Sequence, residues 1–164
     1  MNKILAGILS FFLWLMPWWT GLYDLRERVA FDRNAIMSKI ATYVKSRDVA
    51  NLASMMRPWF KDNVLDLTDK LQDFYDAIDG NIESVHIGTG LGSRDNGGVH
   101  SESLRFGVYT DDETYPYYYL LMWYDVSSSK NRNDVGIGMI ELATGKTTDP
   151  EAMIHFVLKA PEWN

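Results

Sequence analysis

The spacing of apolar residues changes once along this chain, at Gly80, and no other feature constrains the fold as strongly. Before Gly80, apolar residues recur every three or four positions, which is the period of an amphipathic helix. After Gly80 they alternate with polar residues, which is the period of a strand with one buried face. Helices followed by strands, without strand–helix–strand alternation, predict an α+β fold with an antiparallel sheet.

Three helices are expected before Gly80. Asp48 is the expected N-cap of the second helix, and Pro58 ends that helix because a proline disfavours helical backbone in the residue before it. Asp62 or Asn63 caps the third, which stops at Gly80. The three apolar stripes are Ile36, Ile40, Tyr43 and Val44; Val49, Leu52, Met55 and Met56; and Leu67, Leu71, Phe74 and Ile78.

Four strands are expected after Gly80. The third is apolar at almost every position and so is predicted to be a central strand, buried on both faces. A glycine-rich loop over residues 88–98 separates the first two strands, and a short helix that begins at Asp149 or Pro150 and runs to Leu158 closes the chain. The strands are residues 82–87, the alternating segment around residues 104–108, residues 117–126 and residues 135–142.

The N-terminus carries the pattern of an export or anchoring segment. Residues 4–16 are apolar and follow a single charge, Lys3, as in a secretory signal. Residues 17–21 are too bulky for a peptidase site, and the uncharged stretch of about 20 residues is long enough to cross a bilayer as a helix. A retained anchor in residues 1–22 is therefore favoured over a cleaved signal peptide or a buried helix, and residues 23–164 are expected to form one domain outside the cytoplasm.

Charge and cysteine content exclude several functions. The formal net charge is −6, and no run of Lys or Arg provides the positive surface that a phosphate backbone needs, so nucleic acid is not an expected partner. The chain has no cysteine, which excludes disulfides, thiolate metal sites and cysteine nucleophiles. No cofactor is expected.

Several segments carry a likeness to known proteins. Residues 45–52 (KSRDVANL), residues 78–84 (IDGNIES) and residues 135–140 (VGIGMI), with the tyrosine-rich strand, resemble a family of bacterial lipoproteins without established activity. The order of elements resembles the cone-shaped fold shared by nuclear transport factor 2 and ketosteroid isomerase. This resemblance implies N-terminal helices packed on a curved antiparallel sheet around a pocket. It covers roughly residues 32–142 and brings no catalytic residues with it.

The chain departs from that family in one respect. Such lipoproteins carry a lipobox cysteine at the end of the leader, and this chain has none. Lipid attachment by that route is therefore excluded, and only the peptide itself, through residues 4–22, would hold the protein to a membrane.

Asp125 is the weak candidate for a catalytic residue that the cone-shaped fold suggests. A general base in such a pocket is a carboxylate on an inward strand position, with its pKa raised by apolar neighbours. Asp125 stands at the end of the tyrosine-rich strand and fits this description. The alternative is that Asp125 begins the next hairpin loop, as aspartates often do.

The tyrosine-rich strand has two interpretations. Its rings offer flat apolar surfaces with hydroxyls, which suit a wall of a ligand pocket. They also suit a surface through which two copies of the sheet pair as a homodimer. The residues expected to line the pocket are Phe106, Tyr117, Tyr119 and Trp123.

The glycine loop and the histidines suggest weaker sites. Gly88, Gly90 and Gly92 would let backbone N–H groups face one anion, but a strand is expected after the loop, so a flexible loop is favoured over a phosphate site. His86 and His100 flank the loop and, with Asp95, would be a candidate metal site if their strands paired. Their spacing matches no known ligand pattern, and no metal is expected.

Together these features predict an extracytoplasmic binding or accessory module, not an enzyme, with a small apolar pocket and an apolar ligand. One alternative is an isomerase or dehydratase that uses Asp125 as base and a tyrosine hydroxyl as oxyanion donor. The other is a dimer-forming interaction domain.

Overall fold

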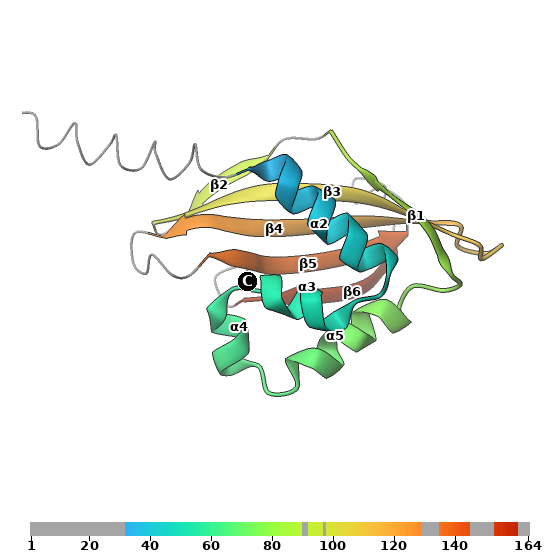
Figure 1. The fold of residues 1–164 in the computed structure, drawn as a ribbon, viewed down its shortest axis with the longest axis horizontal. Helices are drawn as coiled ribbons and strands as arrows, with labels where there is room; N and C mark the ends of the chain where they lie inside the picture. The colour runs from blue at the N-terminus through green and yellow to red at the C-terminus, as the bar shows by residue number, and fades with distance from the viewer. Residues whose placement is uncertain (1–31, 90–91, 97, 129–134, 145–152, 161–164) are drawn as a thin grey trace, which may run out of the picture. The chain divides into compact units, whose positions relative to one another are not determined.

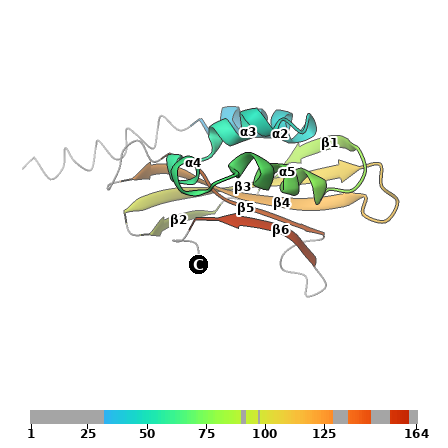
Figure 2. The same cartoon turned by 90° about the horizontal axis from the view of Figure 1, so that it is seen from below.

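Helices and strands form two layers in this protein. The computed structural model describes residues 32–89, 92–96, 98–128, 135–144 and 153–160. All four helices of this part of the chain lie on one face of a six-stranded antiparallel sheet, and the sheet does not close into a barrel (Figures 1 and 2). The predicted α+β class, with N-terminal helices packed on an antiparallel sheet, is therefore confirmed. These elements belong to one compact unit, Arg33–Asn164.

The helical layer begins as the sequence predicts and then differs. Helix α2 is Arg33–Lys45 and α3 is Val49–Met55. Asp48 caps α3 as expected, because its Oδ1 accepts a hydrogen bond of 3.0 Å from the backbone N–H of Asn51.

Pro58 does not simply end a helix. It occupies the first turn of a further helix, α4 (Pro58–Asn63), where its missing N–H is not needed. The third predicted helix, α5, is Leu67–Asp76 and begins after Asp66, so the expected caps at Asp62 and Asn63 are wrong. Helix α5 also ends before Gly80, which has a φ of +73° and lies in the turn that leads to the sheet.

The sheet contains every predicted strand and two more. Its main path has the order β1-β3-β4-β5-β6, with β2 paired to β3 beside β1, and every pairing is antiparallel. The position of β4 in the middle of the sheet confirms the predicted central strand, but only its helical face is fully buried, since Tyr117, Tyr119 and Trp123 on the other face are half-buried. The bounds are β1 Ile82–Ile87, β2 Ser93–Asn96, β3 Val99–Thr110, β4 Tyr117–Ser128, β5 Gly136–Thr144 and β6 Met153–Lys159.

The two additional strands correct two predictions. Part of the expected glycine-rich loop is the short strand β2, which pairs with the first residues of β3. The expected final helix is wrong over its described part, where β6 pairs with β5 instead. Ile154 and Val157 fit a helical spacing, but within β6 they are exposed while Phe156 packs on Phe74 of α5. Asp149 and Pro150 lie outside the described residues.

The core lies between the helices and one face of the sheet. Phe106, Leu120 and Leu142 form one cross-strand row with Phe156, whose ring centroid is 5.6 Å from that of Phe74. Because side chains alternate along a strand, the residues between these positions point to the opposite face. The fully buried members of the core include Ile40, Val44, Leu52, Phe60, Leu71, Phe74, Tyr75, Leu104, Val108, Tyr118 and Met122.

No helix in the described residues is long and apolar enough to cross a membrane. The expected anchor in residues 1–22 lies outside the described residues.

Candidate functional site

Asp125 is a fully buried residue within β4, not the first residue of a loop. Its Oδ2 lies 2.9 Å from Nη1 of Arg57, and the two side chains are 0% and 5% exposed. Its Oδ1 accepts a hydrogen bond of 2.6 Å from the hydroxyl of Ser101, the residue opposite it on β3. A guanidinium and a hydroxyl therefore hold the two oxygens of this carboxylate, as charge-assisted pairs are held in protein interiors.

The backbone between α3 and α4 places Arg57 at this position. Met56 forms a parallel bridge with Ile137 of β5, and the N–H of Arg57 donates to the carbonyl of Ile137 at 3.1 Å. Gly136, which pairs with Asp125, permits this approach. A Cβ at Gly136 would lie 2.7 Å from both the backbone N of Arg57 and the carbonyl O of Met55, too close for any other residue.

This surrounding differs from the one expected of a general base. The expectation was a carboxylate among apolar neighbours, which hold it protonated or poised to take a proton. Asp125 instead has a cation and a hydroxyl donor as neighbours. Each oxygen keeps a further lone pair, so these contacts fix the position of the carboxylate without removing its ability to accept a proton. The geometry fits an ion pair that joins the helical layer to β4.

Three of the four residues expected to line a pocket share one face of the sheet. Tyr117, Tyr119 and Trp123 are half-buried and alternate with Tyr118, Leu120 and Met122, which are fully buried under the helices. Phe106 does not join them. It pairs with Leu120 and is 1% exposed, so it belongs to the core on the helical side.

The face of the sheet that points away from the helices is rich in aromatic side chains. We call it the aromatic face. Tyr109 is 41% exposed, and its ring lies between those of His86 and Tyr117, with centroid distances of 4.9 and 5.0 Å. The described residues that form the aromatic face on β3 and β4 are Gly107, Tyr109, Tyr117, Tyr119, Leu121 and Trp123.

Gly107 leaves room for this arrangement. A Cβ at this position would lie 2.9 Å from Cε2 of Tyr117 and 3.4 Å from Cε2 of Tyr109, so both rings lie against the bare backbone. Burial raises the pKa of the Tyr117 hydroxyl, and the neighbouring Tyr109 and Tyr119 hydroxyls raise it further. The Tyr117 hydroxyl therefore stays neutral at physiological pH, which suits an apolar contact surface.

Two polar side chains next to the aromatic face were missed by sequence reasoning. Ser103 pairs with Trp123, and Arg105 pairs with Leu121. Ser103 is 0% exposed, and neither its Oγ nor Nε of Arg105 has a hydrogen-bond partner in the described part of the chain. Alternation with Leu104 and Phe106 could have placed both residues on this face, but no sequence pattern shows that a polar atom lacks a partner.

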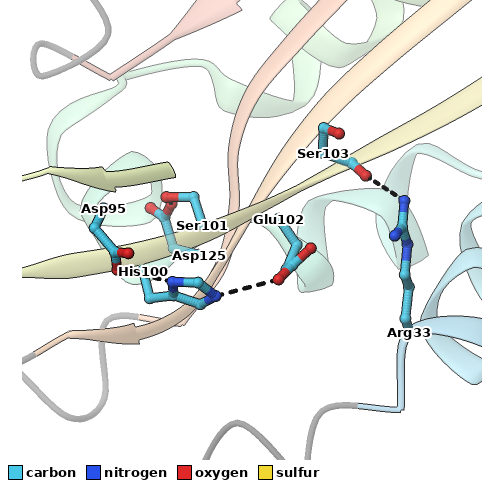
Figure 3. A network of polar contacts seen from close by, with 7 residues as sticks. All are labelled: Arg33, Asp95, His100, Ser101, Glu102, Ser103 and Asp125. Atoms are coloured by element: carbon cyan, nitrogen blue, oxygen red, sulfur yellow. Dashed lines mark hydrogen bonds and ion pairs between the residues drawn. The ribbon is translucent and has the colours of Figure 1, made fainter. Parts of the chain in front are cut away.

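The histidines are not brought together. His86 pairs with Gly107 on β3, whereas His100 lies opposite Asp95 of β2. Nδ1 of His100 is 2.8 Å from Oδ1 of Asp95, and its Nε2 is 3.1 Å from Oε1 of Glu102 (Figure 3). A neutral imidazole has a single N–H, so both contacts are hydrogen bonds only when the ring or one carboxyl group carries the extra proton.

No group of three or more His, Asp or Glu side chains in the described residues is arranged to hold a metal ion. The pairing of Asp95 with His100 therefore joins two strands rather than forming the metal site that His86, His100 and Asp95 suggested. Arg33 of α2 reinforces the same end of β3, because its Nη2 donates a hydrogen bond of 2.7 Å to the carbonyl of Ser103 (Figure 3).

A comparison of the sequence with models of protein families identifies the family of this chain. Residues 39–146 match the domain of unknown function DUF5104. This chain belongs to the DUF5104 family. No curated protein matches the sequence.

The DUF5104 match covers the helices from within α2 onward and all strands up to β5. Both partners of the Arg57–Asp125 ion pair lie inside it, as do the residues of the aromatic face on β3 and β4. Strand β6, with its exposed Ile154 and Val157, lies beyond the match. Family membership thus identifies the domain and does not assign it an activity.

Proposed function

We propose that this DUF5104 domain is a non-enzymatic binding module that takes an apolar ligand on the aromatic face. The observation that carries the proposal is the gathering of Tyr109, Tyr117, Tyr119 and Trp123 on the sheet face opposite the helices. Exposed aromatic and aliphatic side chains on one face mark a binding surface more often than a random part of a protein surface. Rings with neutral hydroxyls offer such a ligand wide apolar contact with few charges.

We propose that the sheet and its helices are a variant of the cone-shaped fold of nuclear transport factor 2. The helices here cover the face that includes Phe106, so Phe106 is part of the core and the ligand contacts the other face.

The enzymatic alternative stays a prediction that we do not adopt. An isomerase or dehydratase mechanism would need Asp125 to accept a proton, and Arg57 and Ser101 occupy its oxygens. On the helical side of the sheet, the hydroxyl of Tyr118 donates a hydrogen bond of 3.0 Å to Oδ2 of Asp79. The two groups therefore each have a structural partner already.

A dimer through the same face is the second candidate. Ile154 and Val157 on β6 are 57% and 42% exposed, and both pair with β5 residues that continue the rows of the aromatic face. Two such sheets stacked face to face would bury these side chains together. The ligand and the second copy would compete for one surface.

We propose further that the domain acts outside the cytoplasm, at a membrane. The support is the apolar segment of residues 4–22, with its single preceding charge and its tryptophan-rich end. Intact mass of the exported protein tests this part of the proposal. A mature chain that begins near residues 20–31 would rule out a retained anchor.

Titration of the purified protein with 1-decanol, followed by calorimetry, tests the binding role. We expect saturable binding that Tyr119→Ala weakens about tenfold, since a buried aromatic contact contributes roughly 1–2 kcal/mol. Asp125→Asn should leave decanol binding unchanged. Sedimentation of the wild type and Tyr119→Ala serves as the control for self-association. A stable dimer that Tyr119→Ala dissociates, together with no decanol binding, would replace the ligand proposal with the dimer.

A further inference from the structure

Ser103 and Arg105 form a pair of unsatisfied donors on β3, beside the aromatic face. Two residues apart on one strand, they point to the same side of the sheet. Oγ of Ser103 and Nη2 of Arg105 lie 2.8 and 3.9 Å from the position where a Cβ of Gly92 would stand. Gly92 therefore packs directly against the Ser103 hydroxyl, with the Arg105 guanidinium beside it, and a side chain at residue 92 would crowd that hydroxyl.

Neither group is satisfied within the described part of the chain. Ser103 is fully buried and its Oγ has no hydrogen-bond partner. Nε of Arg105 is also buried and also has no hydrogen-bond partner. Buried polar atoms without a partner are rare in native proteins, and each lost hydrogen bond destabilises the fold. Such atoms would be satisfied by a partner that the described residues do not supply.

The chemistry of the two groups defines that partner. An arginine has only donors, and a serine hydroxyl can donate, so the missing group is an acceptor. Among the described residues no carboxylate lies within salt-bridge distance of Arg105, although the whole chain carries 22 acidic residues. Arg105 is only half-buried, so its charge can still meet a ligand from solvent. An anion matches both the hydrogen bonds and the charge.

The neighbours of the pair are apolar. Leu121 lies opposite Arg105, Trp123 lies opposite Ser103, and Tyr119 follows across from Gly107. A ligand whose anionic end meets Arg105 would extend its body over these side chains. We infer that the ligand of the aromatic face is an amphiphile with a carboxylate at one end, bound by Arg105 and Ser103. This inference rests on the proposed function and specifies its ligand.

The test compares decanoate with 1-decanol, which has the same chain without the charge, and with inorganic phosphate, which has charge without the chain. Calorimetric titrations are made below the micellar concentrations. We expect decanoate to bind about tenfold or more tightly than decanol, because a charge-assisted hydrogen bond contributes that much to affinity. Phosphate should bind far more weakly than decanoate.

Variants identify the groups responsible. Arg105→Gln should lower decanoate affinity about tenfold or more and leave decanol affinity unchanged, and Arg105→Lys should restore part of the loss. Ser103→Ala should reduce decanoate affinity by a smaller factor without destabilising the fold, since the hydroxyl it removes has no partner in the described residues. Lys39→Gln, an exposed position on α2, is the control for net charge and should have no effect.

The failures of the two proposals are distinguishable. Equal binding of decanoate and decanol, unaffected by Arg105→Gln, would overturn the anionic end group and leave the apolar binding face in place. Phosphate binding as tight as decanoate would also overturn the inference, because the apolar body would then contribute nothing. If neither decanoate nor decanol binds, the binding face itself is refuted.

Discussion

The guanidinium of Arg57 and the carboxylate of Asp125 are 68 positions apart in sequence and meet at 2.9 Å in the protein interior. The pair joins the linker between α3 and α4 to the central strand of the sheet. Both side chains are almost fully buried, and each provides the other with a counter-charge.

Removal of the carboxylate should therefore destabilise the protein strongly. Asp125→Ala leaves the Arg57 guanidinium buried without its carboxylate, and we expect a loss of about 3–5 kcal/mol in the free energy of unfolding. Urea unfolding followed by circular dichroism measures it. The double variant Arg57→Met/Asp125→Leu should recover most of the loss, because it buries no charge. If Asp125→Ala is as stable as the wild type, the ion pair does not stabilise the fold.

Gly136 should tolerate no side chain. It has a φ of +140°, and a Cβ would meet backbone atoms of Met55 and Arg57 that cannot rotate away. We expect Gly136→Ala to cost roughly 2–4 kcal/mol, the sum of backbone strain and overpacking. Gly107→Ala is the matched control, since its Cβ would meet only side-chain rings. Equal losses in the two variants would contradict the role of the Met55–Arg57 backbone.

Tyr75 should make the protein sensitive to alkaline pH. Burial raises the pKa of its hydroxyl well above the ordinary value of 10, and the nearby Asp48 carboxylate raises it further. A folded-state pKa above the unfolded one means that this stability is complete below about pH 10 and is lost as the pH rises further. The denaturant midpoint of the wild type should fall as the pH rises from 8 to about 11. In Tyr75→Phe the midpoint should fall by less over the same range.

The Tyr75→Phe variant also loses the hydrogen bond of 3.1 Å from its hydroxyl to the carbonyl of Tyr43. We expect a uniform loss of about 1 kcal/mol at neutral pH in addition to the flatter alkaline profile. An alkaline profile as steep as that of the wild type would assign the effect to other tyrosines. Tyr117, Tyr118 and Tyr124 also have raised pKa values, in each case mainly through burial.

Asp48 should have the opposite effect at acid pH. Hydrogen bonds from the backbone and side chain of Asn51 lower the pKa of this N-cap carboxylate. A lowered folded-state pKa means that its contribution is present above the unfolded value of about 4 and is lost as the pH falls through the folded value. Asp48→Asn keeps an N-cap acceptor without a titrating group, so it should flatten the acid side of the stability curve. Midpoints from pH 2 to 5 measure this difference.

The periodicity of the sequence was sufficient to predict the layers of the fold. The change at Gly80 separates the helices from the strands, and the apolar run of β4 corresponds to its central place in the sheet. Local sequence signals gave a wrong prediction where one residue pattern is compatible with two different structures. Pro58 is compatible with both the end of one helix and the first turn of the next, and only the tertiary structure selects α4.

The candidate site was harder to predict, because it depends on pairing between distant strands. Alternation along β4 could place Tyr117, Tyr119 and Trp123 on one face, but Phe106 joins the opposite face through its register with Leu120. The partner of Asp125 could not be read from sequence, since Arg57 reaches it only through the bridge between Met56 and Ile137. No local pattern encodes that contact.

The bridge between Met56 and Ile137 also imposes an order on folding. Helices α3 and α4 consist of local contacts and can form early, but the backbone between them is fixed only by β5, which is synthesised much later. Until β5 is in place, Arg57 has neither its carbonyl acceptor on Ile137 nor the pairing that brings it to Asp125. In a chain that is synthesised from its N-terminus, the connection between α3 and α4 can therefore reach its final position only after β5 has left the ribosome.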